Sequence, residues 1–383
     1  MKPIAEATGS KTGATENHGY GLVDCDVHPY FKQGLRDLMD YMTKSWQSRL
    51  GIGQGASWSK NFAASEFVLP LDYLYINTAG ATRMDSSPEG GIPGSDPAFM
   101  AEQLLDGCNI SRAVLIAGHL FGIGAFPDPD VSAVVAQAYN DWQRELWLEF
   151  DPRYRGAIVI PPQNPEAAVK EIERSGDVPG VVAIFMPLHD IAMGESHYYP
   201  IYEAAQAHGL PVIVHPSGTE SVFARAPRMA VQPTYYIEWH TMLGQVHQSN
   251  MASLICHGVF ERFPELKVIV AEGGFMWAIE TMLKLDRDWQ ALRDEVPWLK
   301  RPPSEYVRNN IRFTTQPMVE PHRPEQVEQI LDMVYADETL LFSSDYPHWD
   351  FDDPSRALAG ISDERRRHIC VDNAVALFGD RLK

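Results

Sequence analysis

The sequence predicts an α/β fold, a (β/α)8 or TIM barrel with a long insertion after its first strand. Eight short runs rich in Val, Ile and Leu recur along the 383 residues. Near-continuous apolar runs of this kind are typical of strands buried on both faces of a parallel sheet. Amphipathic stretches separate the runs, and this alternation repeated eight times favours a barrel. The alternative is a doubly wound open sheet with additional strands.

The predicted strands are distributed along the whole chain, and a helix is predicted after most of them. The clearest helix is the stretch NPEAAVKEIERSG, where Asn164 before Pro165 is a typical N-cap and Gly176 a typical helix end. In chain order, the eight predicted strand runs are Gly21–Asp24, Arg112–Gly118, Arg155–Ile160, Gly180–Met186, Pro211–Pro216, Lys267–Glu272, Ile311–Thr315 and Leu340–Asp345.

Two segments fall outside the regular alternation. Residues 1–20 are polar and lack the apolar stretch of a signal peptide, so we expect a flexible N-terminal tail ahead of a barrel over residues 21–383. The connection Phe31–Pro97 is long and rich in Gly, Ser and aromatic residues. Loops of this length are usually functional, and we expect residues 31–97 to form a cap-like insertion over the barrel mouth.

Composition excludes several classes of partner. The formal net charge of −19 argues against binding to nucleic acid or to an anionic membrane surface. No apolar run approaches the roughly 18 residues that a membrane span needs. The four cysteines form no CxxC pair, which argues against a zinc ribbon or a disulfide framework, and a reducing cytoplasm is the expected compartment.

The first predicted strand ends in an unusual cluster of polar residues, in the stretch GLVDCDVHPY. Side chains two residues apart share one face of a strand, so Asp24, Asp26 and His28 should all point toward the barrel axis. Unpaired charges there would each cost several kcal/mol. A bound divalent metal is the simplest way to stabilise them, although a DxH motif alone is more often structural or solvated.

Other predicted strands also end in residues of metal-binding type. His215 ends the fifth, Glu272 the sixth and Asp345 the eighth. Taken alone, His215 is better interpreted as a core histidine and Asp345 as a helix N-cap. Because catalytic groups of such barrels gather at the carboxyl ends of the strands, their coincidence with Asp26 and His28 favours one shared site. Two imidazoles and two carboxylates suit zinc, manganese or ferrous iron.

Four stretches of the chain resemble a known family: VDCDVHP, PVIVHPSG, GVFERFPELKVIVAEGGFMWAIETMLKLD and LFSSDYPHWD. Over about residues 21–378 the chain is similar to the amidohydrolase-related (amidohydrolase 2) family, which includes aminocarboxymuconate-semialdehyde, resorcylate and carboxyvanillate decarboxylases. The resemblance implies that Asp26, His28, His215 and Asp345 are metal ligands. It also implies that Asp345 transfers protons, and that the protein is a homo-oligomer.

The chain departs from the family pattern at two positions. Asp26 occupies the place where aminocarboxymuconate-semialdehyde decarboxylase has a histidine, and Glu272 stands where the decarboxylases usually place a histidine that donates a proton. Other amidohydrolases hold two metals bridged by a lysine after the fourth strand, but VVAIFMPLHD contains none. We therefore expect one divalent ion, zinc first, with Mn²⁺ and Fe²⁺ as alternatives.

Three further residues are candidates for the chemistry. If Asp26, Asp345 and Glu272 are all ionised, one divalent metal leaves a net charge of about −1, which would repel a carboxylate substrate. Glu272 would then be either a protonated donor or a further metal ligand, the alternative being an arginine-paired scaffold residue. His348 is expected to orient Asp345 or contact the metal, unless it makes only a loop hydrogen bond. His240 is expected to touch substrate from a helix at the mouth, unless it is only a helix-face histidine.

The resemblance implies non-oxidative decarboxylation of a small aromatic or unsaturated carboxylic acid. The metal would chelate the carboxylate and an adjacent oxygen while Asp345 or Glu272 protonates carbon. The alternative is hydrolysis of an amide, lactone, ester or C–C bond by a metal-activated water, with Asp345 as general base. A third alternative is an inactive metal- or ligand-binding barrel.

Overall fold

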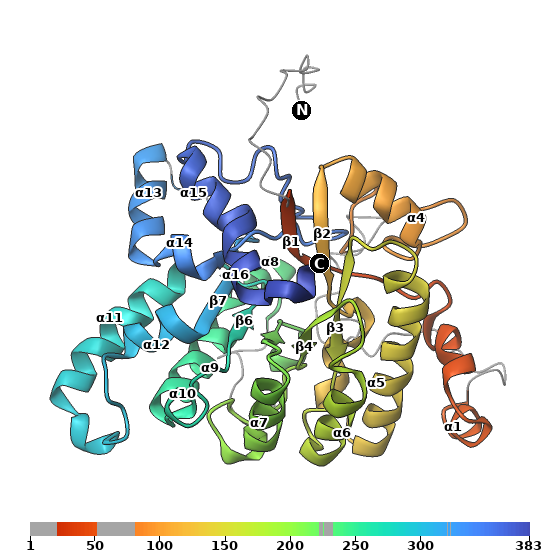
Figure 1. The fold of residues 1–383 in the computed structure, drawn as a ribbon, viewed down its shortest axis with the longest axis horizontal. Helices are drawn as coiled ribbons and strands as arrows, with labels where there is room; N and C mark the ends of the chain where they lie inside the picture. Colours follow the sequence, from red (N-terminus) through yellow and green to blue (C-terminus); the bar gives the residue numbers. More distant parts are fainter. Residues whose placement is uncertain (1–20, 52–80, 222–224, 226–232, 320, 322) are drawn as a thin grey trace.

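The computed structural model describes residues 21–51, 81–221, 225, 233–319, 321 and 323–383. Its centre is a sheet of eight parallel strands, each beside its neighbour in sequence (Figure 1). The expected strand runs all overlap the observed strands. These are β1 Leu22–Val27, β2 Ile110–Leu115, β3 Tyr154–Val159, β4 Val181–Phe185, β5 Val212–Val214, β6 Val268–Val270, β7 Ile311–Thr314 and β8 Leu340–Leu341.

The first and last strands meet, which brings the sheet round into a barrel. The Cys25 N–H donates to the Phe342 carbonyl at 2.9 Å, and the His28 N–H donates to the Tyr346 carbonyl at 2.8 Å. An open sheet would leave these edges unpaired. The predicted (β/α)8 barrel is therefore confirmed, and the doubly wound alternative is wrong.

Helices surround the barrel and follow most strands (Figure 1). Among the described residues, no helix has both the length and the apolar character needed to cross a membrane. The α-helices are α1 Lys44–Arg49, α4 Pro97–Met100, α5 Pro129–Gln143, α6 Pro165–Ser175, α7 Tyr199–Ala207, α8 Tyr236–Thr241, α9 Gly244–Cys256, α10 Val259–Arg262, α11 Met276–Ala291, α12 Pro303–Asn310, α13 Pro324–Met333, α14 Ala336–Thr339, α15 Asp363–Arg367 and α16 Asn373–Phe378. Short 3-10 or π elements are η1 Gly34–Tyr41, η2 Ala101–Asp106, η3 Gly118–Ala125, η4 Arg144–Leu148, η5 Ser196–Tyr198, η6 Thr219–Ser221, η7 Arg293–Glu295, η8 His368–Asp372 and η9 Gly379–Leu382.

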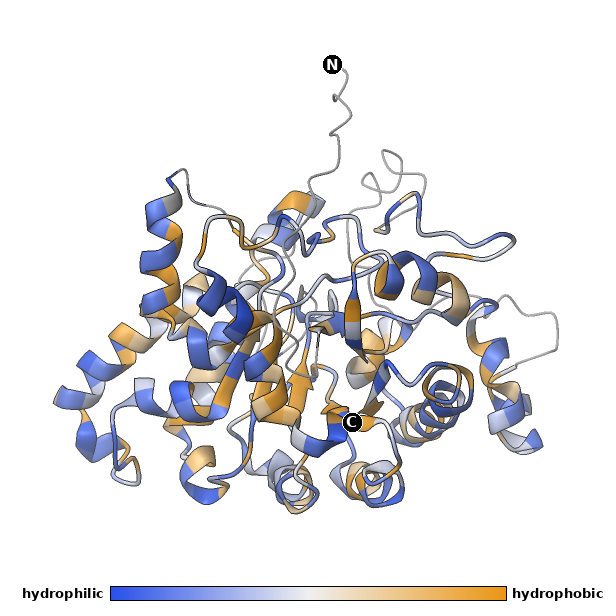
Figure 2. Ribbon diagram, turned by 45° about the horizontal axis from the view of Figure 1, so that its top comes forward, coloured by the Kyte–Doolittle hydropathy of each residue, from blue (hydrophilic) through white to orange (hydrophobic). Residues whose placement is uncertain are grey.

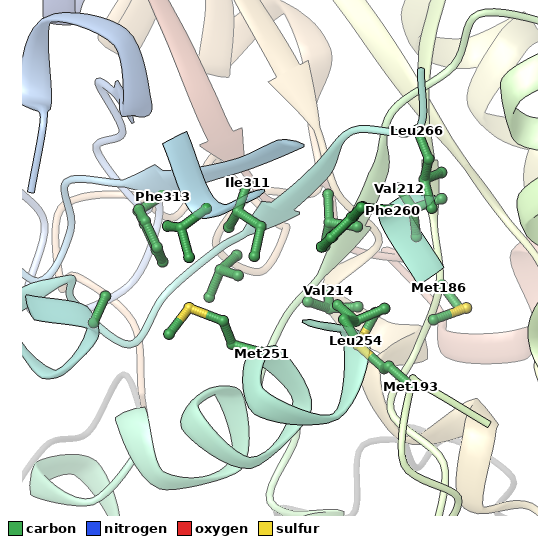
Figure 3. Packing of buried hydrophobic residues seen from close by; sticks show 14 of the residues in the cluster. Met186, Met193, Val212, Val214, Met251, Leu254, Phe260, Leu266, Ile311 and Phe313 are labelled. Atoms are coloured by element: carbon green, nitrogen blue, oxygen red, sulfur yellow. The ribbon is translucent and has the colours of Figure 1, made fainter. Parts of the chain in front are cut away.

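The core lies between the strands and the helices. Figure 2 shows the strands mostly in hydrophobic colours, whereas the helices carry hydrophilic residues as well. Met251 and Leu254 of α9 pack in one buried cluster with Val214 of β5 and Phe313 of β7 (Figure 3). Such packing holds the carboxyl ends of the strands in fixed positions, which is the requirement for a preorganised site.

The helix α6 begins and ends where the sequence predicts. Asn164 is the N-cap, and its side-chain oxygen accepts a hydrogen bond from the Ala167 N–H at 3.1 Å. Pro165 occupies the first turn, where its missing N–H costs nothing, and Gly176 is the C-cap.

Asn164→Ala is expected to lower the free energy of unfolding by about 1 kcal/mol, because it leaves an N–H of the first turn of α6 without its side-chain acceptor. Turnover should not change, because α6 lies in the outer shell. Urea unfolding followed by circular dichroism measures the effect. A wild-type midpoint would show that water replaces the cap at no cost.

The insertion after β1 is described only in part. Residues 1–20 and 52–80 lie outside the described residues, so the flexible tail and the cap over the mouth stay predictions. The described end of the insertion contacts the loop that follows β8: the Arg83 N–H donates to the Pro347 carbonyl at 2.8 Å. It also contacts the residues after β1, where the Tyr30 N–H donates to the Gly94 carbonyl at 2.8 Å.

Candidate active site

Four side chains of metal-binding type meet at the carboxyl ends of the strands. Asp26 lies in β1, His28 just after it, His215 after β5 and Asp345 after β8. Each offers one ligand atom, all four atoms lie within 4.8 Å of one another, and all four residues are buried. We call these residues the four-residue cluster. The structure thus brings together the residues that the sequence predicts as ligands.

The ring of His28 is held with one nitrogen toward the carboxylates. Its Nδ1 lies 3.0 Å from the carbonyl oxygen of Ile116, which can only accept, so Nδ1 carries the hydrogen. Its Nε2 lies 2.8 Å from Asp345 Oδ1 and 3.1 Å from Asp26 Oδ1. A histidine with one nitrogen fixed on a backbone carbonyl and the other among anionic oxygens has the usual arrangement of a metal ligand.

His215 repeats this arrangement from the other side of the barrel. Its Nδ1 donates to the Pro216 carbonyl at 2.7 Å, and its ring stacks on Phe121 with centroids 4.2 Å apart. Its Nε2 lies 3.0 Å from Glu272 Oε2 and 3.7 Å from Asp26 Oδ2. Burial and the neighbouring His28 lower the pKa of His215 well below its ordinary value, which keeps a lone pair on Nε2.

Several buried polar atoms at the centre of the cluster have no hydrogen-bond partner among the described residues. They are both carboxylate oxygens of Asp26, Oδ2 of Asp345 and Nε2 of His215. Buried polar groups without partners cost free energy, and buried charges cost more. A cation bound among these atoms would satisfy all of them, so the donor set fits a divalent metal.

The charge environment differs between the carboxylates of the site. Burial alone would raise the pKa of Asp345, but His348 and His28 outweigh it and hold this pKa well below its usual range. Burial, followed by the charge of Asp345, raises the pKa of Glu272 well above its ordinary value. Neighbouring carboxylates with opposite shifts are a common feature of active sites.

Two of the site residues have an unusual backbone. Glu272 and Asp345 adopt positive φ angles of 40° and 60°. Such conformations cost about 1–3 kcal/mol in non-glycine residues and persist where the surroundings hold them. Here the Glu272 N–H donates to Thr314 Oγ1, and His247 Nε2–H donates to the Glu272 carbonyl, both at 3.1 Å. The carboxylate of Glu272 is thus held in place through its backbone.

His348 and Glu272 form a second group with Asp345. Ligand atoms of these three residues lie within 4.8 Å of one another. His348 Nδ1 lies 2.7 Å from Asp345 Oδ1, so it contacts the cluster rather than making only a loop hydrogen bond. Within the described residues, the ionisable nitrogen recorded beside the Glu272 carboxyl group is Nε2 of His215, not that of an arginine, which argues against the scaffold alternative.

His240 belongs to neither group. It belongs to α8, and its Nε2 lies 2.9 Å from Asp350 Oδ2, which also accepts a hydrogen bond from Gln316 Nε2 at 2.7 Å. The side chains of His240 and Asp350 are 18% and 12% exposed. The predicted contact of His240 with substrate stays a prediction.

Three neighbours of the site differ from the sequence analysis, which placed Asp24 beside Asp26 and His28 at the expected metal and gave no role to Tyr30 or Asp350. Asp24 is fully buried, and its Oδ1 accepts hydrogen bonds from the Asp26 N–H and the Ser344 N–H rather than joining the cluster. Burial raises the pKa of Asp24 to about 7. Tyr30 contacts His348, and Asp350 contacts His240. The sequence gives one indication of a role for Tyr30 and Asp350: Tyr30 directly follows the DVHP motif, and Asp350 directly follows DYPHW.

Comparisons with known proteins agree with this architecture. A gamma-resorcylate decarboxylase from Polaromonas sp. is 26% identical over 332 residues, which cover 78% of this chain and 94% of the relative. The crystal structure of an amidohydrolase from Mycobacterium avium subsp. paratuberculosis has a TM-score of 0.66 at 21% identity, covering 94% of this chain and 100% of that one.

A second solved structure is a dihydroxybenzoic acid decarboxylase from Polaromonas sp. with bound manganese and the inhibitor 2-nitroresorcinol. Its TM-score is 0.62 at 20% identity, and the match covers 94% of this chain and 97% of that one. The model of one protein family, described as amidohydrolase, matches residues 23–379, nearly the whole described barrel. The resemblance predicted from the sequence motifs is confirmed: the chain belongs to the amidohydrolase family.

Proposed function

We propose that the protein is a metal-dependent, non-oxidative decarboxylase of a small aromatic or unsaturated carboxylic acid. The observation that carries the proposal is the four-residue cluster, buried and with unpartnered oxygen and nitrogen atoms at its centre. Membership in the amidohydrolase family and the likeness to decarboxylases of dihydroxybenzoic acids support the choice of reaction.

The resident cofactor in this proposal is a single divalent cation held by Asp26, His28, His215 and Asp345. Zinc is our first choice, because two imidazoles and two carboxylates are common zinc ligands. The same donors accept Mn²⁺ or Fe²⁺, and the related Polaromonas structure contains manganese. Assembly as a homo-oligomer and a cytoplasmic location belong to the same proposal, and the four cysteines are free.

The reaction needs a group that binds the substrate carboxylate and a group that delivers a proton. When bound, the cation supplies positive charge for the carboxylate and an adjacent oxygen of the substrate. The carbon–carbon bond to the carboxyl group breaks, carbon dioxide leaves, and the electron pair stays on the substrate carbon. Glu272, whose raised pKa keeps a proton on its carboxyl group, can then deliver that proton to the carbon. Asp345 is ionised, so it can do the same only after it has taken a proton, for example from a hydroxyl group of the substrate.

Incubation of the metal-loaded protein with hydroxybenzoates, unsaturated acids and matched esters tests the proposal. We expect carbon dioxide and the corresponding arene or alkene from at least one acid, and no release of acid from the esters. Release of titratable acid without carbon dioxide would instead establish hydrolysis. A fully metal-loaded protein that turns over no compound of the panel would support an inactive binding barrel.

A further inference from the structure

A chain of three side chains leads from the four-residue cluster toward the insertion. The Tyr30 hydroxyl lies 2.8 Å from His348 Nε2, and His348 Nδ1 lies 2.7 Å from Asp345 Oδ1. The ionised carboxylate can only accept, so Nδ1 must donate. In the neutral ring Nε2 then holds a lone pair, and the phenol donates to it. Asp345 thus holds Nδ1 of His348, and the Tyr30 hydroxyl holds Nε2.

Two glycines lie close against the ring of Tyr30. A Cβ on Gly118 would lie 2.7 Å from Tyr30 Cζ, and a Cβ on Gly94 would lie 2.9 Å from Tyr30 Cδ2. Gly94 also has a φ of +69°, and its carbonyl accepts the Tyr30 N–H. The His119 ring meets the tyrosine edge-on with centroids 4.7 Å apart. This close fit fixes the direction of the hydroxyl.

His348 is held in the same way by its surroundings. It forms an isolated antiparallel bridge with Thr82 of the insertion, and its ring stacks on His28 with centroids 4.7 Å apart. Its side chain is 12% exposed. These contacts restrict where the ring lies, but none of them is a hydrogen bond to Nε2. The hydroxyl of Tyr30 supplies that bond.

We propose that Tyr30 is a positioning residue that acts on Asp345 through His348. Its hydroxyl holds Nε2, so that the Nδ1–H of His348 stays directed at Asp345 Oδ1. Without the hydroxyl, the ring can rotate away from that direction. Asp345 would then lose part of its fixed orientation. The kinetic consequence rests on the proposed function, whereas the hydrogen bond between Tyr30 and His348 does not.

The kinetic test is Tyr30→Phe, which keeps the ring against the two glycines and removes only the hydroxyl. We expect kcat to fall ~10- to 100-fold, the usual effect of losing a residue behind a metal-binding group, with KM and metal content unchanged. The matched control is Tyr202→Phe, which removes a buried hydroxyl that donates to the Met193 carbonyl at 2.7 Å, away from the cluster. The control should keep wild-type kcat.

The spectroscopic test uses the zinc-loaded protein labelled with ¹⁵N-histidine, with the His348 signals assigned from their loss in His348→Gln. We expect the Nε2 signal of His348 to keep its wild-type position in Tyr202→Phe and to shift in Tyr30→Phe, where Nε2 loses its hydrogen-bond partner. An unshifted Nε2 signal in Tyr30→Phe, or an unchanged kcat despite a shifted signal, would overturn the positioning role. If the signal shifts but the wild type decarboxylates no acid, the proposed function fails and the contact of Tyr30 with His348 stands.

Discussion

Asp345→Asn is expected to lower turnover by at least ~10²-fold while the protein still binds its divalent ion. Asparagine keeps the shape of the side chain and one oxygen for the metal, but it removes the basic carboxylate. In the structure, Asp345 Oδ1 is engaged by His28 and His348, whereas Oδ2 has no hydrogen-bond partner among the described residues. Oδ2 is thus the oxygen open to the cation, and Oδ1, which contacts His348 Nδ1, is left for proton transfer.

The control for this prediction is Asp26→Asn, a change of the same chemistry at the neighbouring ligand. It should weaken metal binding first, and added metal should restore part of the rate. Turnover of both variants is measured at matched metal content determined by elemental analysis. If Asp345→Asn then works at nearly the wild-type rate, Asp345 is only a ligand, and proton transfer falls to Glu272 or His348.

Much of the barrel could be predicted because strands buried on both faces leave continuous apolar runs. The ends of the strands were harder to predict, since acids normally interrupt such runs. The first strand was expected over Gly21–Asp24, but β1 continues to Val27. It does so because Asp24 is buried and accepts backbone N–H groups, including that of Ser344. The strand β8 ends at Leu341 because the Phe342 N–H bonds to the carbonyl of Ile369, although the Phe342 carbonyl still accepts the Cys25 N–H of β1.

The metal-binding cluster could be predicted because all parallel strands of a barrel end at the same rim. Knowing that Asp26, His215 and Asp345 end three strands is therefore enough to place them together. The contacts of Tyr30 and His240 could not be predicted in this way. Each depends on a loop conformation that brings together residues more than 100 positions apart, and no periodic pattern encodes it.

His215→Ala is expected to reduce the metal content from about one divalent ion per chain to near zero after dialysis. The variant removes one of four ligands, because Nε2 of His215 is the nitrogen that faces Asp26 and Glu272 from the β5 side of the cluster. The imidazole of His28 and the carboxylates of Asp26 and Asp345 would remain as the only three ligands of the set. Metal binding should therefore weaken severely. Elemental analysis of the dialysed protein measures the effect.

His197→Ala is the matched control for His215→Ala. Both imidazoles bond to the carbonyl of a proline, Pro162 for His197 and Pro216 for His215, but only His215 also faces the carboxylates of the cluster. The control should keep its metal. Full occupancy in His215→Ala would contradict the ligand assignment. Two tightly bound ions per wild-type chain would contradict the single-metal site, because Glu272 and His348 would then have to hold the second ion beside Asp345.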